Sequence, residues 1–65
     1  MNKFKFIGKK TLIIDTLTTN NIYNILQFEH YKNCICVYII DDNKDIICIP
    51  YSNLIKFNEN WRVME

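Results

Sequence analysis

Three features of the sequence predict a small all-β fold, either a strongly bent antiparallel sheet or a barrel of five to six short strands. The 65 residues include 12 Ile, which is β-branched and stiff, and no Ala, the best helix former. Short apolar runs are separated by clusters of polar turn residues. Residues 34–51 are the clearest case, because two β-branched runs flank the polar block 41–45 as in a β-hairpin.

The first part of the chain predicts two strands joined by a turn. Residues 3–7 alternate Lys and Phe at strand spacing. Gly8, the only glycine, marks a turn, and a second strand-like run follows at 11–16. The polar residues 18–21 end this run.

Residues 22–31 allow two interpretations. Thr19 can cap a short helical turn over 19–25, with apolar residues along one stripe. From about Ile25 onward the residues alternate as in a strand, and we favour a strand there.

Two polar pairs predict the turns between the next strands. Lys32–Asn33 fits a two-residue turn, because Asn tolerates the left-handed conformation that such turns need. Asn43–Lys44 offers a second such turn, but it places Asp42 opposite Asp45, so a longer loop is the alternative. The pairs expected from these two turns are Tyr31 with Cys34, Phe28 with Val37, Leu26 with Ile39, Ile40 with Ile47, Ile39 with Cys48, and Tyr38 with Ile49.

This register divides the side chains between two sheet faces. One face is aliphatic and aromatic, and we predict that it forms the core. The other face carries tyrosines, whose hydroxyl groups need water or a partner. The predicted core face collects Leu26, Phe28, Ile35, Val37, Ile39 and Cys48. The opposite face collects Ile25, Tyr31, Cys36, Tyr38, Ile40, Ile47, Ile49 and Tyr51.

The end of the chain predicts one more short strand. Pro50 closes the preceding strand, because proline cannot donate to a ladder. After Ser52–Asn53 we expect a strand at 54–57 and a flexible tail at 58–65. Residues 49–57, Ile-Pro-Tyr-Ser-Asn-Leu-Ile-Lys-Phe, resemble the end of a Src-homology-3 domain. The resemblance implies an SH3-like barrel but no binding residues, because the acidic-aromatic motif expected near the start of that family is absent.

Length and composition restrict the class of protein. Residues 1–65 make one small domain, whose formal charge of +1 and pI of about 7.7 give no global attraction to nucleic acid or anionic membranes. No apolar run is long enough to span a membrane, and no signal-peptide core follows Met1, so we expect a cytoplasmic protein. The many Ile, Asn and Lys residues are typical of AT-rich coding DNA, as in a low-GC bacterium, its phages or plasmids, or an AT-rich eukaryote or virus. A small phage or mobile-element factor is compatible with this composition.

The three cysteines, Cys34, Cys36 and Cys48, are predicted to be reduced packing residues. Their odd number argues against the disulfide framework of a small secreted protein. Together with His30 they match the number of ligands that zinc takes. The expected register places His30 and Cys48 on one face and the other two cysteines on the opposite face, so we predict no metal and no cofactor.

Two further patterns point weakly to chemistry. The block 41–45 has the spacing that opens a calcium loop, but Ile46 and Ser52 occupy the positions that need Gly and an acidic residue. A solvated hairpin tip is the favoured interpretation. Cys and His together can form a nucleophilic site, but a sheet of this size has little material for a cleft. We therefore expect no enzymatic activity.

The tyrosine-bearing face is the leading candidate binding site. A small domain cannot easily cover two apolar faces, and Tyr and Trp are common interface anchors. We expect a non-catalytic protein-interaction module, a regulator or inhibitor, that binds a protein partner or itself and forms a homo-oligomer. The alternative is that the N-terminal strands or the tail cover this face. The predicted partner-binding residues are Tyr31, Tyr38, Ile47, Ile49, Tyr51 and Trp61.

The basic N-terminal strand supports a second function. Lys residues interleaved with Phe4 and Phe6 suit single-stranded nucleic acid, because bases stack on aromatic rings and phosphates pair with cations. In the competing interpretation the lysines protect an exposed edge while the phenylalanines face the core. The residues of this alternative nucleic-acid site are Lys3, Lys5, Lys9 and Lys10.

Overall fold

The structure, a computed structural model, describes residues 3–9, 11–12 and 14–64. Within them, five antiparallel strands form one open sheet in the order β4-β3-β2-β1-β5, together with one short helix. The prediction of a small all-β fold with five to six short strands is confirmed, and five strands are present among these residues. The elements are β1 (Lys3–Phe6), β2 (Ile22–His30), β3 (Ile35–Ile40), β4 (Ile46–Tyr51), α1 (Leu54–Asn60) and β5 (Trp61–Met64).

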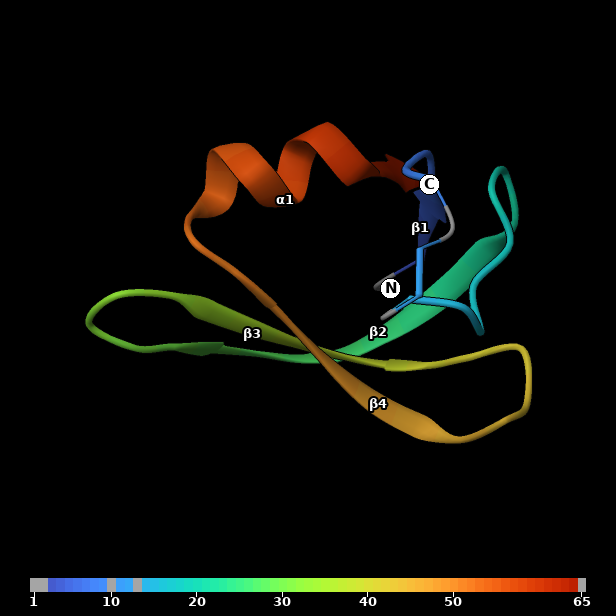
Figure 1. Cartoon of the computed structure of the whole chain (residues 1–65), viewed down its shortest axis with the longest axis horizontal. Helices are drawn as coiled ribbons and strands as arrows, with labels where there is room; N and C mark the ends of the chain where they lie inside the picture. The colour runs from blue at the N-terminus through green and yellow to red at the C-terminus, as the bar shows by residue number, and fades with distance from the viewer. Residues whose placement is uncertain (1–2, 10, 13, 65) are drawn as a thin grey trace.

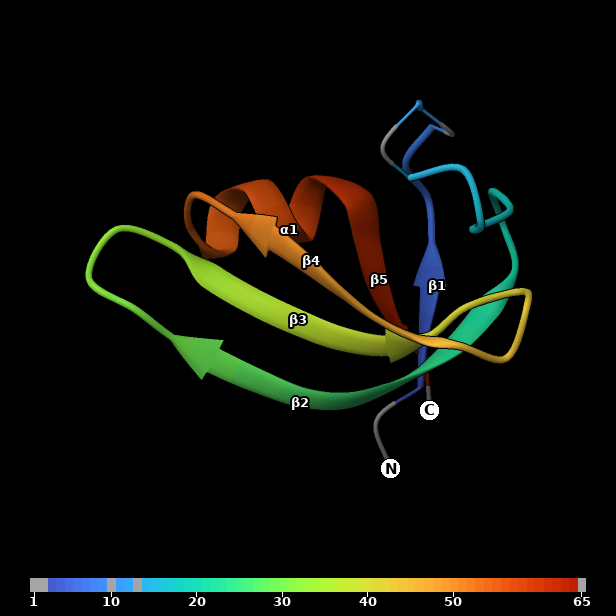
Figure 2. The same cartoon turned by 60° about the horizontal axis from the view of Figure 1, so that its bottom comes forward.

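The sheet is strongly bent, and β2 belongs to both of its halves (Figure 1). The beginning of β2 pairs with β1, and the rest of it pairs with β3. Figure 2 shows β2 curving from beside β1 to beside β3. Helix α1 lies on the same side of β3 and β4 as strands β1 and β5, so the core is enclosed between the two halves of the sheet and the helix (Figure 1).

The β2–β3 hairpin follows the predicted register over its outer part only. The Tyr31 amide donates to the Cys34 carbonyl at 2.8 Å across the Lys32–Asn33 turn, and Phe28 lies opposite Val37 as predicted. The register then shifts between Ile25 and Gln27. Such a bulge adds one residue to a strand and increases its bend. The predicted pairing of Leu26 with Ile39 is therefore wrong, since Ile25 lies opposite Ile39.

The β3–β4 hairpin has a longer loop than the favoured two-residue turn. Asp41 donates its amide to the Asp45 carbonyl at 2.9 Å, and Lys44 adopts a left-handed conformation with φ of 65°. This is a three-residue loop with a bulge residue, and it avoids pairing Asp42 with Asp45. The predicted β4 register is thus wrong by one residue, and a shift of one residue exchanges the faces of a strand. The observed pairs are Ile40 with Ile46, Ile39 with Ile47, Tyr38 with Cys48, and Val37 with Ile49.

Two of the predicted elements before β2 are wrong. The described residues of the run 11–16 belong to a long connection between β1 and β2 rather than to a strand, and position 13 lies outside the described residues. The helical turn considered over 19–25 is replaced by a tight turn and by the start of β2 at Ile22. Asn20 adopts a φ of 75° in that turn, a conformation that Asn tolerates.

The C-terminal segment was also predicted wrongly. Residues 54–57, expected to form a strand, are part of α1. The helix begins after Asn53, because the side chain of Asn53 accepts a hydrogen bond from the Lys56 backbone amide at 2.9 Å. Residues 61–64, expected in a flexible tail, form β5 and pair with β1. The chain therefore closes its core with residues from both ends of the sequence.

The core is rich in aromatic rings. Phe57 of α1 packs against Trp61 with ring planes 11° apart, and it meets Tyr51 edge to face at 5.7 Å between ring centroids. Trp61 donates its indole N–H to the Tyr51 hydroxyl at 2.8 Å, which satisfies both buried polar groups. The buried hydrophobic residues are Phe6, Leu17, Tyr23, Ile25, Ile35, Val37, Ile39, Ile49, Tyr51, Phe57 and Trp61.

Candidate functional site

One face of β2, β3 and β4 points away from the core and carries an apolar surface, here called the outer patch. Side chains alternate along a strand, so the residues between the buried ones of β3 and β4 face outward. Ile46 is 66% exposed, and Leu26 in the β2 bulge is 46% exposed. The outer patch consists of Leu26, Tyr31, Cys36, Tyr38, Ile46 and Cys48.

A carboxylate organises the tyrosines of the outer patch. Glu29 accepts hydrogen bonds at Oε1 from the hydroxyls of Tyr38 at 2.7 Å and Tyr31 at 2.8 Å. The Oε2 atom of Glu29 accepts a hydrogen bond from the side-chain amide of Gln27 at 3.2 Å. The bonds from Tyr38 and Tyr31 lower the pKa of Glu29, and the same bonds raise the pKa of both tyrosines. Glu29 is thus ionised at neutral pH, and it holds two aromatic rings in defined positions.

The cysteines of β3 and β4 lie on this same face. Burial and contact with the thiol of Cys48 raise the pKa of Cys36 to about 11. The prediction that Cys36 and Cys48 face opposite sides is wrong, because the shift of the β4 register turns Cys48 outward. A thiol with a raised pKa stays protonated at neutral pH and is a poor nucleophile and metal ligand. In the described part of the chain, no group of three or more His, Cys, Asp or Glu side chains could hold a metal ion.

The structure divides the six predicted partner-binding residues between two environments. Tyr31 is 56% exposed, and Tyr38 is half-buried on the outer patch. Ile49, Tyr51 and Trp61 are buried in the core, and Ile47 packs against it. The prediction that the β4 residues share a face with Tyr38 is wrong because of the longer β3–β4 loop, which also made sequence reasoning miss Ile46 and Cys48.

The predicted basic residues are partly brought together. Lys3 and Lys5 lie on β1, and Lys5 lies directly opposite Arg62 of β5. Lys9 is exposed in the connection after β1, while Lys10 lies outside the described residues. Sequence reasoning missed Arg62, because it was expected in the tail.

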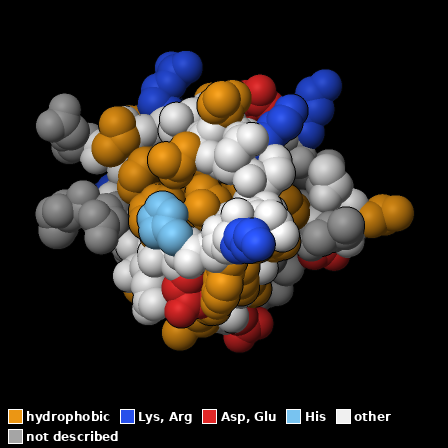
Figure 3. Space-filling view, turned by 90° about the vertical axis from the view of Figure 1, so that its left-hand side faces the viewer, with side chains coloured by type: hydrophobic (Ala, Val, Ile, Leu, Met, Phe, Trp, Pro, Cys, Tyr) orange, Lys and Arg blue, Asp and Glu red, His pale blue; other side chains and the backbone are white. Residues whose placement is uncertain are grey.

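Exposed apolar side chains also occur at the end of the molecule formed by the β2–β3 turn and the start of α1. Figure 3 shows hydrophobic side chains gathered on this end, with basic and acidic groups around them. Tyr31 after β2 and Leu54 and Ile55 at the start of α1 are exposed. Tyr31 is thus the outer-patch residue that lies at this end of the molecule.

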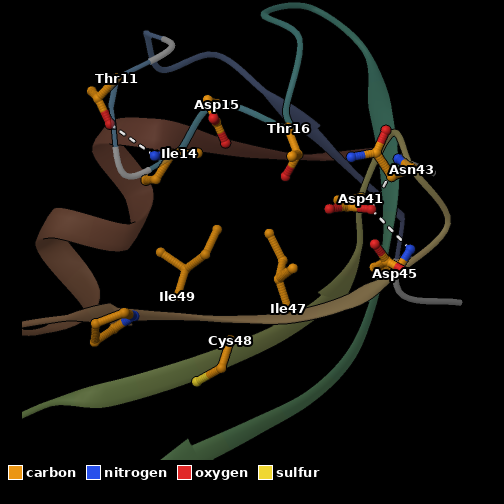
Figure 4. A pocket seen from close by; sticks show the side chains of 11 residues that line it. Thr11, Ile14, Asp15, Thr16, Asp41, Asn43, Asp45, Ile47, Cys48 and Ile49 are labelled. Carbon is orange, nitrogen blue, oxygen red and sulfur yellow. Dashed lines mark hydrogen bonds between the residues drawn. The ribbon is translucent and has the colours of Figure 1, made fainter.

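A groove of about 530 Å³ lies between β4 and the connection that precedes β2 (Figure 4). Ile14 faces Ile47 and Ile49 across it, Asp15 lies beside Ile14, and Asp45 lies beyond Ile47. Asp41, which also lines the groove, is only 3% exposed. Burial would raise the pKa of Asp41, but hydrogen bonds from backbone amides and from the Thr16 hydroxyl outweigh this effect and lower it.

The walls of this groove are tied together by hydrogen bonds. Tyr23 donates its hydroxyl to Asp42 Oδ1 at 2.7 Å and accepts from the Thr18 amide at 2.7 Å. Thr18 also donates its hydroxyl to Asp42 Oδ2 at 2.7 Å, and the Asp42 amide donates to the Thr16 carbonyl at 3.0 Å. Burial and the bond to Asp42 raise the pKa of Tyr23. The long connection is thereby fixed to the β3–β4 loop.

Comparisons with known proteins add no family or relative to this description. No protein-family model, curated protein or solved structure matches the chain significantly. Among the described residues, no helix is both long and apolar enough to cross a membrane.

Proposed function

We propose that this chain is a small non-catalytic protein-interaction module, a regulator or inhibitor that binds a protein partner or a second copy of itself through the outer patch. The observation that supports the proposal is the exposed apolar surface over β2, β3 and β4, centred on the bonds between Glu29 and two tyrosines. A viral, phage or mobile-element origin stays a prediction from composition.

The chemistry of the outer patch suits protein binding. Tyrosine offers a large apolar ring with few rotatable bonds, so that little conformational entropy is lost when a partner packs on it. The bonds to Glu29 restrict Tyr31 and Tyr38 before any partner arrives, which lowers the cost of binding further. The raised pKa of Cys36 keeps that thiol neutral and favours a packing role over catalysis.

The test compares one charge inserted at two exposed aliphatic positions. Ile46→Lys lies in the outer patch, whereas Leu12→Lys changes a side chain that is 99% exposed in the connection before β2. We expect Ile46→Lys to weaken self-association, measured by sedimentation, or capture of a specific protein from the native host. Leu12→Lys should leave both unchanged. Equal behaviour of the two variants would argue against the outer patch as the interface.

A specific observation keeps nucleic-acid binding as the second candidate. Lys5 and Arg62 lie opposite each other on adjacent strands, and Lys3 lies on the same strand as Lys5. Such a cluster can pair with phosphates, and binding of this kind falls as salt rises. Retention on single-stranded DNA or RNA that decreases with salt and is lost in Lys5→Gln with Arg62→Gln would support this candidate.

A further inference from the structure

The edge of β4 that faces away from β3 has unpaired backbone groups. The Asp41 amide donates to the Asp45 carbonyl, so these two opposite residues form a hydrogen-bonded pair of the antiparallel ladder. Hydrogen-bonded and non-hydrogen-bonded pairs alternate along such a ladder. The backbone groups that point away from β3 are therefore the amides and carbonyls of Ile46 and Cys48 and the carbonyl of Pro50. Pro50 fits this pattern, because its missing N–H then removes no bond to β3.

Among the described residues, no other strand pairs with this edge of β4. β4 is the last strand of the sheet, and none of its outward groups takes part in the loop hydrogen bonds of the described residues. Its sequence, Ile-Ile-Cys-Ile-Pro-Tyr, contains no charged residue. Edge strands are usually protected by charges, bulges or a covering element, and only Pro50 provides protection here.

The groove lies beside this open edge. In Figure 4, Ile47 and Ile49 of β4 point toward Ile14, so the groove has an apolar side directly along the strand. Asp45 precedes β4 at one end of the groove, and Asp15 lines the opposite wall beside Ile14. The sole ion pair among the described residues joins Lys56 and Glu59, so neither of these aspartates has a cationic partner there.

We propose that β4 and the groove bind an extended, basic peptide segment of another protein, which adds to the sheet as a further strand. Backbone pairing supplies the register, and alternate side chains enter the groove. The side chains of the bound segment that enter the groove lie on the opposite face of β4 from the outer patch, although the pairing edge uses the backbone of Ile46 and Cys48.

The geometry specifies the pattern of the bound segment. Side chains opposite Ile49, Ile47 and Asp45 are two residues apart and point to the same face. In antiparallel pairing, the segment therefore reads apolar-x-apolar-x-basic, with Lys or Arg opposite Asp45. A second copy of β4 fits this pattern poorly, because residues 46–51 provide no basic side chain.

The probe is a capped peptide of sequence Thr-Val-Thr-Ile-Thr-Lys, titrated into the isotopically labelled full chain. We expect the amides of Ile46 and Cys48 to become protected from hydrogen exchange when the peptide binds. Methylation of the peptide nitrogens that face β4 should abolish binding, whereas methylation of the alternate nitrogens should be tolerated. Replacement of the peptide Lys by Glu should weaken binding as well.

Protein variants test the charge contribution. Asp15→Asn and Asp45→Asn should each weaken peptide binding about two- to fivefold, the range for an exposed ion pair. Glu59→Gln removes a carboxylate on α1 and should leave the affinity unchanged. Tyr31→Ala in the outer patch should also leave it unchanged, which separates a failure of this site from a failure of the proposed function.

Three results would overturn the inference. The first is the absence of peptide binding at millimolar concentration. The second is an equal affinity for peptides methylated at nitrogens that face β4 and at the alternate nitrogens. The third is protection of Ile46 and Cys48 that depends on protein concentration without peptide, because a second copy would then occupy the edge.

Discussion

The two faces of β3 are both apolar in sequence but differ in what covers them. Ile35, Val37 and Ile39 are buried under the rings of α1 and β5 and the side chains of β4. On the opposite face, Cys36 and Tyr38 are half-buried among neighbours on the same sheet face, and no element of the described chain lies over them. The difference shows that apolar composition does not by itself distinguish a core face from an exposed face. The segments that pack against each face decide this.

A charge placed on each face of the sheet should give the largest difference in stability. Val37→Asp buries an unpaired carboxylate where the side chain is fully covered, so we expect a loss of about 4 kcal/mol or more, which unfolds a domain of this size. The matched change Ile46→Asp on the exposed face should change the free energy of unfolding by less than about 0.5 kcal/mol. Chemical denaturation followed by circular dichroism measures both, and similar losses would show that the faces are assigned wrongly.

A change in the β3–β4 loop tests how much the side chain of Asp42 stabilises the fold. Asp42→Ala removes the acceptor of the hydroxyl bonds from Tyr23 and Thr18, and we expect a loss of about 1–2 kcal/mol. Asp45→Ala is the control, because only the backbone of Asp45 takes part in the bonds of this loop. A thermal midpoint lowered equally by both changes would contradict the role assigned to the Asp42 side chain.

The pH dependence of the outer face gives a smaller effect. The pKa of Glu29 is lowered from its usual value of 4.5 by the tyrosine hydroxyls, so its stabilising bonds are fully present above that value. They are lost as the pH falls through the lowered pKa of the folded state. We expect the ring proton signals of Tyr31 and Tyr38 to shift in that acidic window, and Glu29→Gln should abolish the shift. A midpoint above 4.5 would contradict the sign.

The smallest expected effect concerns the thiols of the outer patch. Cys48 is exposed, whereas the pKa of Cys36 is raised to about 11, so Cys36 contains little thiolate at neutral pH. We expect an alkylating reagent to modify Cys48 before Cys36, as followed by mass spectrometry of peptides. If the cysteines are packing residues that hold no zinc, a chelator should leave the thermal midpoint unchanged. Removal of a structural zinc ion would instead lower it, because such an ion contributes directly to folding. Faster modification of Cys36 would be inconsistent with its environment.

Local sequence patterns correctly predicted the features that depend on neighbouring residues. The lack of Ala and the many Ile residues predicted an all-β chain, and the Lys32–Asn33 turn fixed the pairing of Phe28 with Val37. The alternation in β3 was also assigned to the right faces, because strand side chains have a strict period of two. These predictions succeeded because a tight turn and its flanking strands specify each other locally.

Contacts between distant parts of the chain determine the features for which local sequence signals were evenly balanced or absent. The repulsion between Asp42 and Asp45 hinted at a longer loop, but the left-handed conformation of Lys44 has no signal of its own in the sequence. The capping role of Asn53 was missed, because Ser52–Asn53 also fits a turn before a short strand. Trp61 and the rest of β5 become a strand only through pairing with β1, at the other end of the chain. Such long-range pairing cannot be read from neighbouring residues, because its free energy comes from burial that exists only in the folded chain.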